Sequence, residues 1–312
     1  METLFRSISS VFLVLLLTAT GFFCAKIGWL NAQAKSFISK FTLNIAVPGM
    51  CIYGLTNKLN CEVIEQSGLY ILIPTLSIVG MILLSFIIGK CFFKLPRRKL
   101  GVFIMMCSQS NSLFVGYAMC TELFGDACVP YVMLYYLVGT CFTQLVGTSL
   151  VRWSGEAESP SVWEKLVKIL TFPPVMGVTV GVLLVLVDCS LPSIVNSYCK
   201  YLNNLVTPLA LLLTGYIIYD IGLKNIKVDS DLSVMMVFRF IIAPVSSFLL
   251  ANVFGIEGLA RSVVVIESAM PIVSQTVVAA AEYGADEQFA ARGAAVSTIA
   301  NFLVIPALMM LL

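Results

Sequence analysis

The chain has 312 residues, of which 59% are hydrophobic and 12% charged, with a formal net charge of +2. The mean hydropathy is +0.96, and the apolar residues fall in long runs instead of the 3.6-residue stripe of a helix on a soluble core. This composition predicts a membrane protein with the lipid bilayer as its solvent. The small net charge gives no reason to expect a nucleic-acid partner, because the basic residues anchor helix ends at the membrane edge.

Ten apolar segments are candidates for membrane helices, each of which needs roughly 20 apolar residues to cross a bilayer core about 30 Å thick. Six of them are long runs without charges: Ser7–Ala25, Leu69–Gly89, Ala127–Val151, Ile169–Val187, Tyr201–Tyr219 and Gly293–Leu312. Four are shorter or interrupted: Phe41–Asn57, Leu100–Cys120, Ser233–Phe254 and Leu259–Ala281. We therefore predict an all-α membrane protein with ten transmembrane helices.

The first apolar segment could also be read as a signal peptide, since Arg6 precedes it. No soluble region follows it, however, so we expect it to stay in the protein as the first span.

Basic residues give the expected orientation. We number the ten segments in chain order and give each connection the number of the segment before it. Only four of the 19 Lys and Arg residues then fall at the start of the chain or in even-numbered connections: Arg6, Lys58, Lys200 and Arg261. The remaining 15 lie in odd-numbered connections or, for Arg239, near one, and basic connections stay in the cytoplasm. We expect a multi-pass protein of the plasma or inner membrane with both termini outside.

The sequence offers no metal site. It has no histidine and ten scattered cysteines without a CxxC pair, so we expect no metal or other cofactor and interpret the cysteines as small apolar side chains. Four of them lie toward the outer side, which leaves a disulfide open: Cys61, Cys128, Cys189 and Cys199.

The two halves of the chain share a pattern at an offset of about 160 residues. Lys-x3-Asn-x3-Pro begins at both Lys40 and Lys200, and Glu-x3-Asp begins at both Glu122 and Glu282. Because each half has five spans, an odd number, the second copy must enter the bilayer from the opposite face. This predicts inverted repeats at 1–152 and 166–312 joined by a cytoplasmic linker at 153–165, an organisation typical of secondary transporters.

The fourth span carries five consecutive polar residues at its centre, Ser108 to Ser112. At about 100° per residue these five positions point around the whole helix, so no rotation hides them from lipid. In the ninth span, the 160-residue offset places Pro271 opposite Asn111, and proline removes a backbone donor in mid-helix. We therefore predict two broken helices, in spans four and nine, that cross at the midplane.

Each break would expose the N-terminus of a half-helix, whose free N–H groups favour an anion. The predicted substrate-binding residues lie at the two breaks: Ser110, Asn111, Ser112, Pro271, Ser274 and Gln275. Any single serine here could instead only bond a neighbouring helix. The symmetric placement of Asn111 and Pro271 favours the site.

The residues predicted to couple an ion are Glu267, Arg239, Ser108 and Gln109. With no histidine present, the Glu267 carboxylate is the natural proton carrier, since an acid inside a membrane is costly and marks function by default. The alternative is a structural ion pair between Glu267 and Arg239, and the sequence does not decide between the two.

Several motifs resemble the auxin efflux carrier family. They are "SNSLFVG" at the first break, "AMPIVSQTVVAAAEYGAD" at the second, "LNIAVPGMCIYGL", "FPPVMGVTVG", "LVTPLALLLTGYIIYD" and "AVSTIANFLVIP". Their order and spacing extend the resemblance over essentially the whole chain. The sequence departs from the family pattern at Ser110, where a proline is common, and at Phe172, where an asparagine is common.

The resemblance implies a compact, bacterial-type carrier related in fold to the bile acid sodium symporters. Spans 1, 2, 6 and 7 would form a scaffold, which leaves a homodimer through these helices open, and spans 3–5 and 8–10 would form a moving transport domain. The cargo would be a small organic anion, auxin-like or malonate-like, carried by an elevator mechanism. H⁺ as the coupling ion is a hypothesis that comes from Glu267 and not from the resemblance.

Two other functions stay open. Backbone oxygens at the breaks, with Ser108, Gln109 and Gln275, could coordinate Na⁺ and make a sodium symporter. A ligand-binding sensor without transport is a different class, although the connections are too short for an output domain. We do not expect an enzyme, because no Ser or Cys nucleophile has an evident base beside it.

Overall fold

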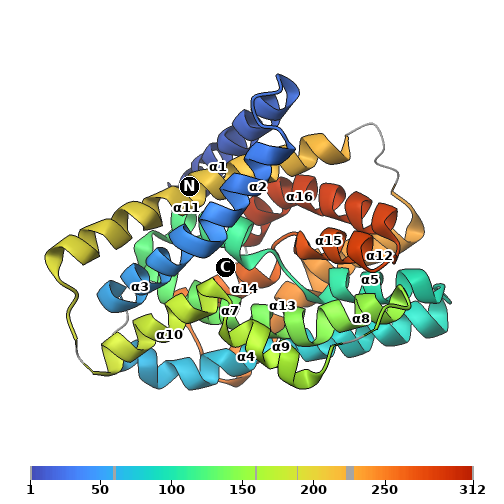
Figure 1. Ribbon diagram of the computed structural model, residues 1–312. Coiled ribbons are helices and arrows are strands. Elements are labelled where there is room, and N and C mark those ends of the chain that lie inside the picture. The colour runs from blue at the N-terminus through green and yellow to red at the C-terminus, as the bar shows by residue number, and fades with distance from the viewer. Residues whose placement is uncertain (1, 59–60, 159, 188, 223–227, 311–312) are drawn as a thin grey trace.

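The structure is a computed structural model that describes residues 2–58, 61–158, 160–187, 189–222 and 228–310 (Figure 1). Within these ranges every regular element is a helix and no strand is formed, which confirms the all-α prediction. Lys224, Lys227 and residues 311–312, which entered the predictions of orientation and of the last span, lie outside the described residues.

The elements of the first half are α1 (Glu2–Lys26), α2 (Ala32–Phe41), η1 (Thr42–Ala46), α3 (Val47–Lys58), α4 (Cys61–Ile87), η2 (Ile88–Phe92), α5 (Arg97–Ser108), η3 (Ser112–Gly116), α6 (Tyr117–Phe124), η4 (Asp126–Cys128), α7 (Val129–Phe142), η5 (Thr143–Gly147) and α8 (Thr148–Ser154). Those of the second half are α9 (Val162–Leu170), α10 (Pro173–Leu186), α11 (Ser193–Ile221), α12 (Ser230–Val237), η7 (Phe238–Ile242), α13 (Ala243–Val253), α14 (Gly258–Ser268), α15 (Gln275–Glu282) and α16 (Glu287–Met309). The elements η1, η2, η3, η5 and η7 are single π-helical turns, and η4 is a 3₁₀ turn.

Six helical stretches of the described chain are long and apolar enough to cross a bilayer: Ala32–Asn57, Gly68–Phe92, Asp126–Ser154, Ser193–Asp220, Ser230–Val253 and Glu287–Met309. The pair α9 and α10, bent by 62°, could make a seventh. Shorter apolar helices occupy Val11–Lys26 and Ser112–Phe124. The protein is therefore a helical membrane protein.

The segment between the halves contains a helix that the sequence reading did not separate from its neighbours. A capping box between Ser161 and Glu164 starts α9, which lies partly in the expected linker. Phe172 then takes an extended backbone (φ −71°, ψ 121°) because it precedes a proline, and Pro173 opens α10. The helix α10 thus begins at Pro173, as expected of a proline pair that can open a helix, inside the apolar run that starts at Ile169.

Glycines allow four helices to pack closely in one part of the bundle, where α1 lies along α11 and α3 lies along α10 and α11. A Cβ atom at Gly21 would lie 2.2 Å from the backbone oxygen of Leu212, and one at Gly177 would lie 2.6 Å from Cα of Pro48. The absence of a side chain at these glycines therefore lets the helix backbones approach each other closely.

Candidate functional site

Both helices break where the sequence predicts. The first broken helix ends at Ser108, the last residue of α5, and the helical structure begins again at Ser112, the first residue of η3. The second stops at Ser268, the last residue of α14, and resumes at Gln275, the first residue of α15. Each interrupted helix therefore contributes one free C-terminus and one free N-terminus.

The two breaks cross each other through backbone hydrogen bonds. Ser110 and Ile272 form an isolated antiparallel bridge. The Asn111 N–H donates to the carbonyl oxygen of Pro271 at 2.8 Å, and the Val273 N–H donates to that of Gln109 at 3.3 Å. The extended backbone of the two breaks is thus satisfied within the protein, as a membrane interior would require.

Asn111 is central to the crossing and is 7% exposed. Its Oδ1 accepts from the Phe114 N–H at 3.3 Å, which caps the half-helix made of η3 and α6. Its Nδ2 donates to Oγ of Ser274 at 3.5 Å, immediately before α15. One amide side chain therefore contacts the starts of both half-helices.

The other predicted residues lie around this point with different neighbours. Ser110 donates to the phenol oxygen of Tyr135 on α7 at 3.3 Å, and Ser112 is buried as the first residue of η3. Gln275 accepts from Nε2 of Gln144 at 3.5 Å.

Ser108 and Gln109, which the sequence suggested for ion coupling, already have protein partners. The Ser108 hydroxyl donates to the carbonyl of Ile104 at 2.8 Å, and Oε1 of Gln109 accepts from the Thr143 hydroxyl at 3.1 Å. The Gln109 side chain therefore links the end of α5 with η5 beside the crossing, whereas the Ser108 bond stays within α5.

Glu267 is completely buried on α14. Its Oε1 accepts from Sγ of Cys120 at 3.5 Å, whereas Oε2 is among the buried polar atoms of the described chain that have no partner. A Cβ atom at Gly116 would lie 2.3 Å from Oε2, so the carboxylate rests against the backbone of the half-helix that Asn111 caps. A change in this carboxylate can therefore reach the crossing directly.

Arg239, on η7, is 1% exposed and bonds to backbone instead of to an acid. Its guanidinium donates to the carbonyl oxygens of Cys107 at 3.1 Å and Met270 at 3.2 Å, and also to that of Ser268. Within the described chain no ion pair joins it to Glu267, so the structural pairing considered from the sequence does not form. The positive charge instead faces the C-terminal ends of α5 and α14, where helix dipoles are negative.

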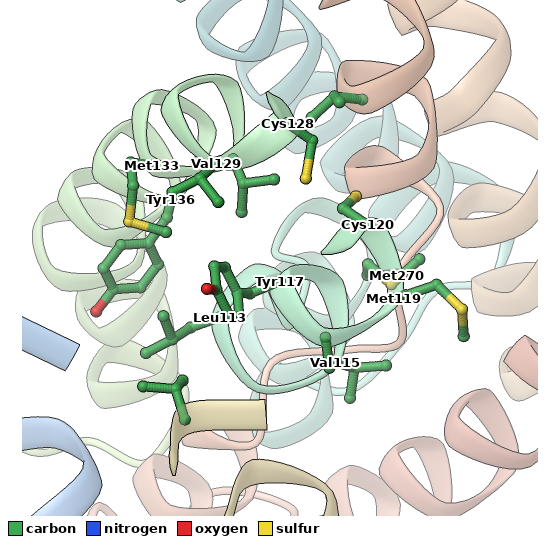
Figure 2. Close-up of a cluster of buried hydrophobic side chains, with 14 of the residues drawn as sticks. Leu113, Val115, Tyr117, Met119, Cys120, Cys128, Val129, Met133, Tyr136 and Met270 are labelled. Atoms are coloured by element: carbon green, nitrogen blue, oxygen red, sulfur yellow. The ribbon is translucent and has the colours of Figure 1, made fainter. Parts of the chain in front are cut away.

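The half-helix of η3 and α6 is held by apolar side chains. Leu113, Tyr117 and Cys120 pack toward Val129 and Met133 of α7 in one buried cluster (Figure 2). This packing fixes the direction in which the capped N-terminus points.

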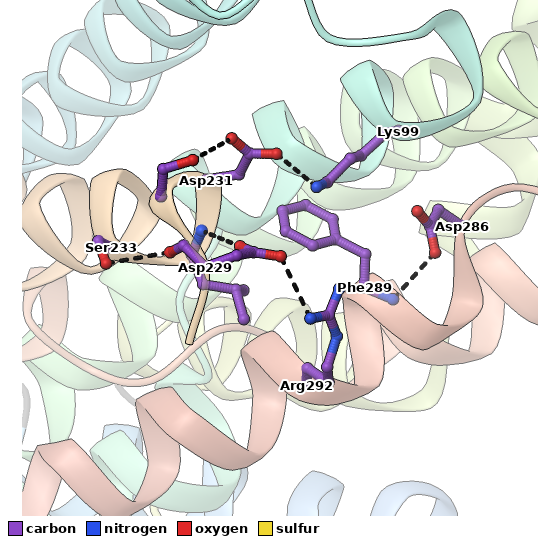
Figure 3. Close-up of polar contacts among 9 residues, drawn as sticks. Lys99, Asp229, Asp231, Ser233, Asp286, Phe289 and Arg292 are labelled. Carbon is purple, nitrogen blue, oxygen red and sulfur yellow. Dashed lines mark hydrogen bonds and ion pairs between the residues drawn. The ribbon is translucent and has the colours of Figure 1, made fainter. Parts of the chain in front are cut away.

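A polar cluster joins the starts of α5, α12 and α16 (Figure 3). Lys99 pairs with Asp231 and lies 4.0 Å from the ring centroid of Phe289, while Arg292 pairs with Asp229 at 3.2 Å. Asp229 also accepts from the Leu232 N–H and caps α12. Three helices from both halves of the chain therefore begin at one end of the bundle.

Several residues of the site went unnoticed in the sequence. Thr143 and Gln144 are two consecutive polar residues inside the fifth apolar segment. Polar residues inside an apolar segment also mark the break at Ser108 to Ser112, so the same criterion identifies this pair. Ser297 accepts from the Ile272 N–H at 3.3 Å, and Asn301, one turn further along α16, is completely buried. Further buried polar atoms without a partner in the described chain belong to Asn301, Thr276, Tyr70 and Thr42.

Comparison with known proteins gives matches along almost the whole chain. A family model described as membrane transport protein matches residues 6–310. An uncharacterized transporter of Methanocaldococcus jannaschii is 27% identical over 300 residues, which are 95% of each chain. An uncharacterized transporter of Methanothermobacter thermautotrophicus is 24% identical over 309 residues, which are 96% of each chain. These relatives carry the names of transporters and not of enzymes.

Proposed function

Because the chain belongs to the membrane transport protein family, and so to the auxin efflux carriers that its motifs resemble, we propose that it is a secondary transporter of a small organic anion. Its cargo is a carboxylate of auxin-like or malonate-like chemistry, and its place is the cell membrane.

The observation that carries this proposal is the contact between Asn111 and Ser274 at 3.5 Å, where two half-helices begin side by side. The first-turn N–H groups and the positive dipole ends of both favour an anion at this point. Asn111 supplies an amide donor, and the Ser112, Ser274 and Gln275 side chains surround the same starts. Ser110 and Pro271 shape the crossing through the backbone.

The proposed arrangement has ten membrane helices in two inverted repeats, with the crossing at mid-depth. The polar cluster of Lys99 and Arg292 supports it, because spans four, eight and ten of such an arrangement must all begin on one side. By the distribution of basic residues this side is cytoplasmic, and both termini are outside.

The proposed movement is that of an elevator. The helices α1 to α3, α10 and α11 serve as the scaffold, and the glycine-mediated packing of α1 on α11 supports a rigid body there. The other membrane helices carry the crossing. One hydrogen bond across the proposed boundary is that of the Tyr117 hydroxyl to Oδ1 of Asn203 at 2.8 Å.

Transport of malonate and of indole-3-acetate into proteoliposomes tests the proposal. We expect saturable uptake of a carboxylate and a fall of at least about tenfold in Asn111→Ala, since a hydrogen bond to a charged group contributes roughly 1.5–3 kcal/mol. Asn252→Ala is the matched control, because Asn252 bonds Arg261 away from the crossing. Uptake at the wild-type rate in Asn111→Ala would contradict the assignment of Asn111 to the substrate site. If the protein binds the carboxylate but does not transport it, the function as a ligand-binding sensor is favoured.

The coupling ion is H⁺, carried by Glu267. Measuring uptake after replacement of external sodium by choline distinguishes proton coupling from sodium coupling. We expect unchanged uptake in choline, and loss of uptake would make the protein a sodium symporter.

A further inference from the structure

A small pocket lies beside the crossing, between α8, α9 and the end of α15. Its lining residues are Gln144, Thr148, Arg152, Pro160, Lys165, Lys168 and Tyr283. They come from parts of the chain up to 139 positions apart, so the pocket is a product of the fold and not of a local motif.

The pocket is positively charged. Three of its lining residues are Arg152, Lys165 and Lys168, and no carboxylate is among them. The acid nearest to it on α15 is the exposed Glu282, which interacts with the Tyr283 hydroxyl. Glu164, on α9, is engaged in the capping box with Ser161.

The hydrogen bonds of these cations go to neutral groups. Arg152 donates to the Tyr283 hydroxyl at 2.6 Å and to the backbone carbonyl of Glu158 at 3.0 Å. Lys165 donates to the Ser149 hydroxyl at 2.7 Å. In the part of the chain that the structure describes, none of the three cations forms a salt bridge. Arg152 also stacks on the Tyr283 ring at 3.9 Å from its centroid, so the two lysines contribute the less engaged charges.

A single pair of glutamines separates the pocket from the crossing. Gln144 lines the pocket and donates to Gln275 at 3.5 Å. Gln275 begins α15, and the residue before it, Ser274, contacts Asn111. An anion in the pocket is therefore one side-chain contact away from the half-helix starts.

The two lysines and the other lining residues come from different sides of the proposed elevator. Lys165 and Lys168 lie on α9, which leads into the scaffold helix α10, whereas Gln144, Arg152 and Tyr283 belong to helices of the moving part. The pocket therefore lies at the boundary along which the moving part would slide.

We infer that this pocket is an anion-collecting vestibule, which draws the carboxylate to the transporter before it reaches the crossing. The inference rests on the proposed function and adds an outer contact for the ligand's carboxylate group, because the pocket has a volume of about 30 Å³ and does not hold a whole malonate. Unneutralised charges of one sign in a recess raise the local concentration of a counter-ion and its rate of arrival, and this effect weakens as salt rises.

Uptake of radiolabelled malonate at concentrations well below saturation is the first test, in proteoliposomes whose carriers have the cytoplasmic side outward, with Lys165→Gln/Lys168→Gln compared with the wild type. We expect an initial rate about three- to tenfold lower at 10 mM NaCl, a smaller difference at 300 mM NaCl, and an unchanged maximal rate. Lys90→Gln/Lys94→Gln removes the same charge outside the pocket and should behave as the wild type. An equal loss in both double variants, or none in either, would overturn the vestibule.

A second measurement needs no transport, so it separates failure of the vestibule from failure of the proposed function. Pro160→Cys places a thiol in the pocket lining, and its modification by a sulfonate-bearing and by an ammonium-bearing methanethiosulfonate is followed by mass spectrometry of the peptide that contains it. We expect the anionic reagent to modify the thiol severalfold faster than the cationic reagent does. This ratio of the two rates should fall when Lys165→Gln/Lys168→Gln is added. An equal preference with and without the lysines would overturn the inference, even if malonate is transported.

Discussion

The guanidinium of Arg239 donates to the carbonyl oxygen of Cys107 across 3.1 Å, which joins η7 to the last turn of α5. The same group donates to Ser268 and Met270 at the end of α14. One buried cation thereby satisfies carbonyls that both helix ends leave without an intrahelical partner. Because it offsets the negative ends of α5 and α14, the positive ends of the following half-helices stay available to an anion.

Arg239→Met should therefore loosen the crossing. A hydrogen bond to a charged group contributes about 1.5–3 kcal/mol, so amide exchange at 105–113 and 269–276 should rise at least about tenfold, while α1 and α11 stay protected. Arg239→Lys keeps the positive charge but loses the forked arrangement of donors, so its amide exchange rate should lie between those of the wild type and Arg239→Met. The control is Arg261→Met, an arginine on α14 that bonds Asn252. Unchanged exchange in Arg239→Met would contradict the role of Arg239.

Glu267→Gln should separate transport from the proton gradient. The carboxylate is buried against Gly116, and its Oε2 has no partner in the described chain, so an added proton would change its contact with the capped half-helix. We expect the variant to exchange internal for external malonate while its uptake no longer depends on an imposed pH gradient. Glu257→Gln, at the exposed start of the same helix, should keep that dependence. Gradient-dependent uptake in Glu267→Gln would exclude this carboxylate as the carrier.

The helix breaks could be predicted because local chemistry alone demands them. Five polar residues around Asn111 cannot face lipid in an intact helix, and Pro271 lacks an N–H. The sequence could not assign the partner of Arg239, because its acceptors are carbonyls 29 to 132 positions away. For a charged residue, a sequence suggests an oppositely charged residue as the partner. The free carbonyl groups at a helix C-terminus can be assigned as partners only when the end of that helix and its position in the fold are known.

The helix α9 was predictable in principle. Ser161 and Glu164 have the spacing of a capping box, and Pro173 ends the pattern one turn after Ile169. The apolar run that starts at Ile169 crosses this boundary, so apolar length alone does not separate α9 from α10, whereas the proline pair does. The pocket beside α9 could not be predicted, because it depends on the placement of α9 against α8 and α15.

Gly21→Ala should destabilise the packing of α1 on α11. Its Cβ atom would lie 2.2 Å from the backbone oxygen of Leu212, and backbone cannot move aside as a flexible side chain does. Gly80→Ala is the matched control, because no atom lies within 4 Å of a Cβ there. Helix propensity alone favours alanine by about 1 kcal/mol. We therefore expect a lower thermal midpoint for Gly21→Ala and an equal or higher one for Gly80→Ala, measured in the same detergent. Equal midpoints for both variants would show that α1 and α11 do not rely on this contact.

The last prediction concerns Asp229, which lies before α12 at the edge of the bundle. Partial burial acts to raise the pKa of its carboxyl, but the Leu232 N–H, Lys99 and Arg292 outweigh this, and the pKa is lowered from the usual 3.8. A lowered pKa in the folded state stabilises the protein above the unfolded value, and this stabilisation is lost as the pH falls through the folded pKa.

Asp229→Asn should therefore be less stable than the wild type at pH 7, by at most roughly 1 kcal/mol, since the pair with Arg292 is partly exposed and asparagine keeps the cap. The difference should narrow below about pH 4 and vanish once the carboxyl is protonated in the folded wild type. Thermal midpoints between pH 7 and pH 3 measure it. Asp220→Asn, which breaks a more exposed pair with Lys35, is the control and should change little at any pH. A gap for Asp229→Asn that stays constant down to pH 3 would mean that the lost stability does not come from the charge.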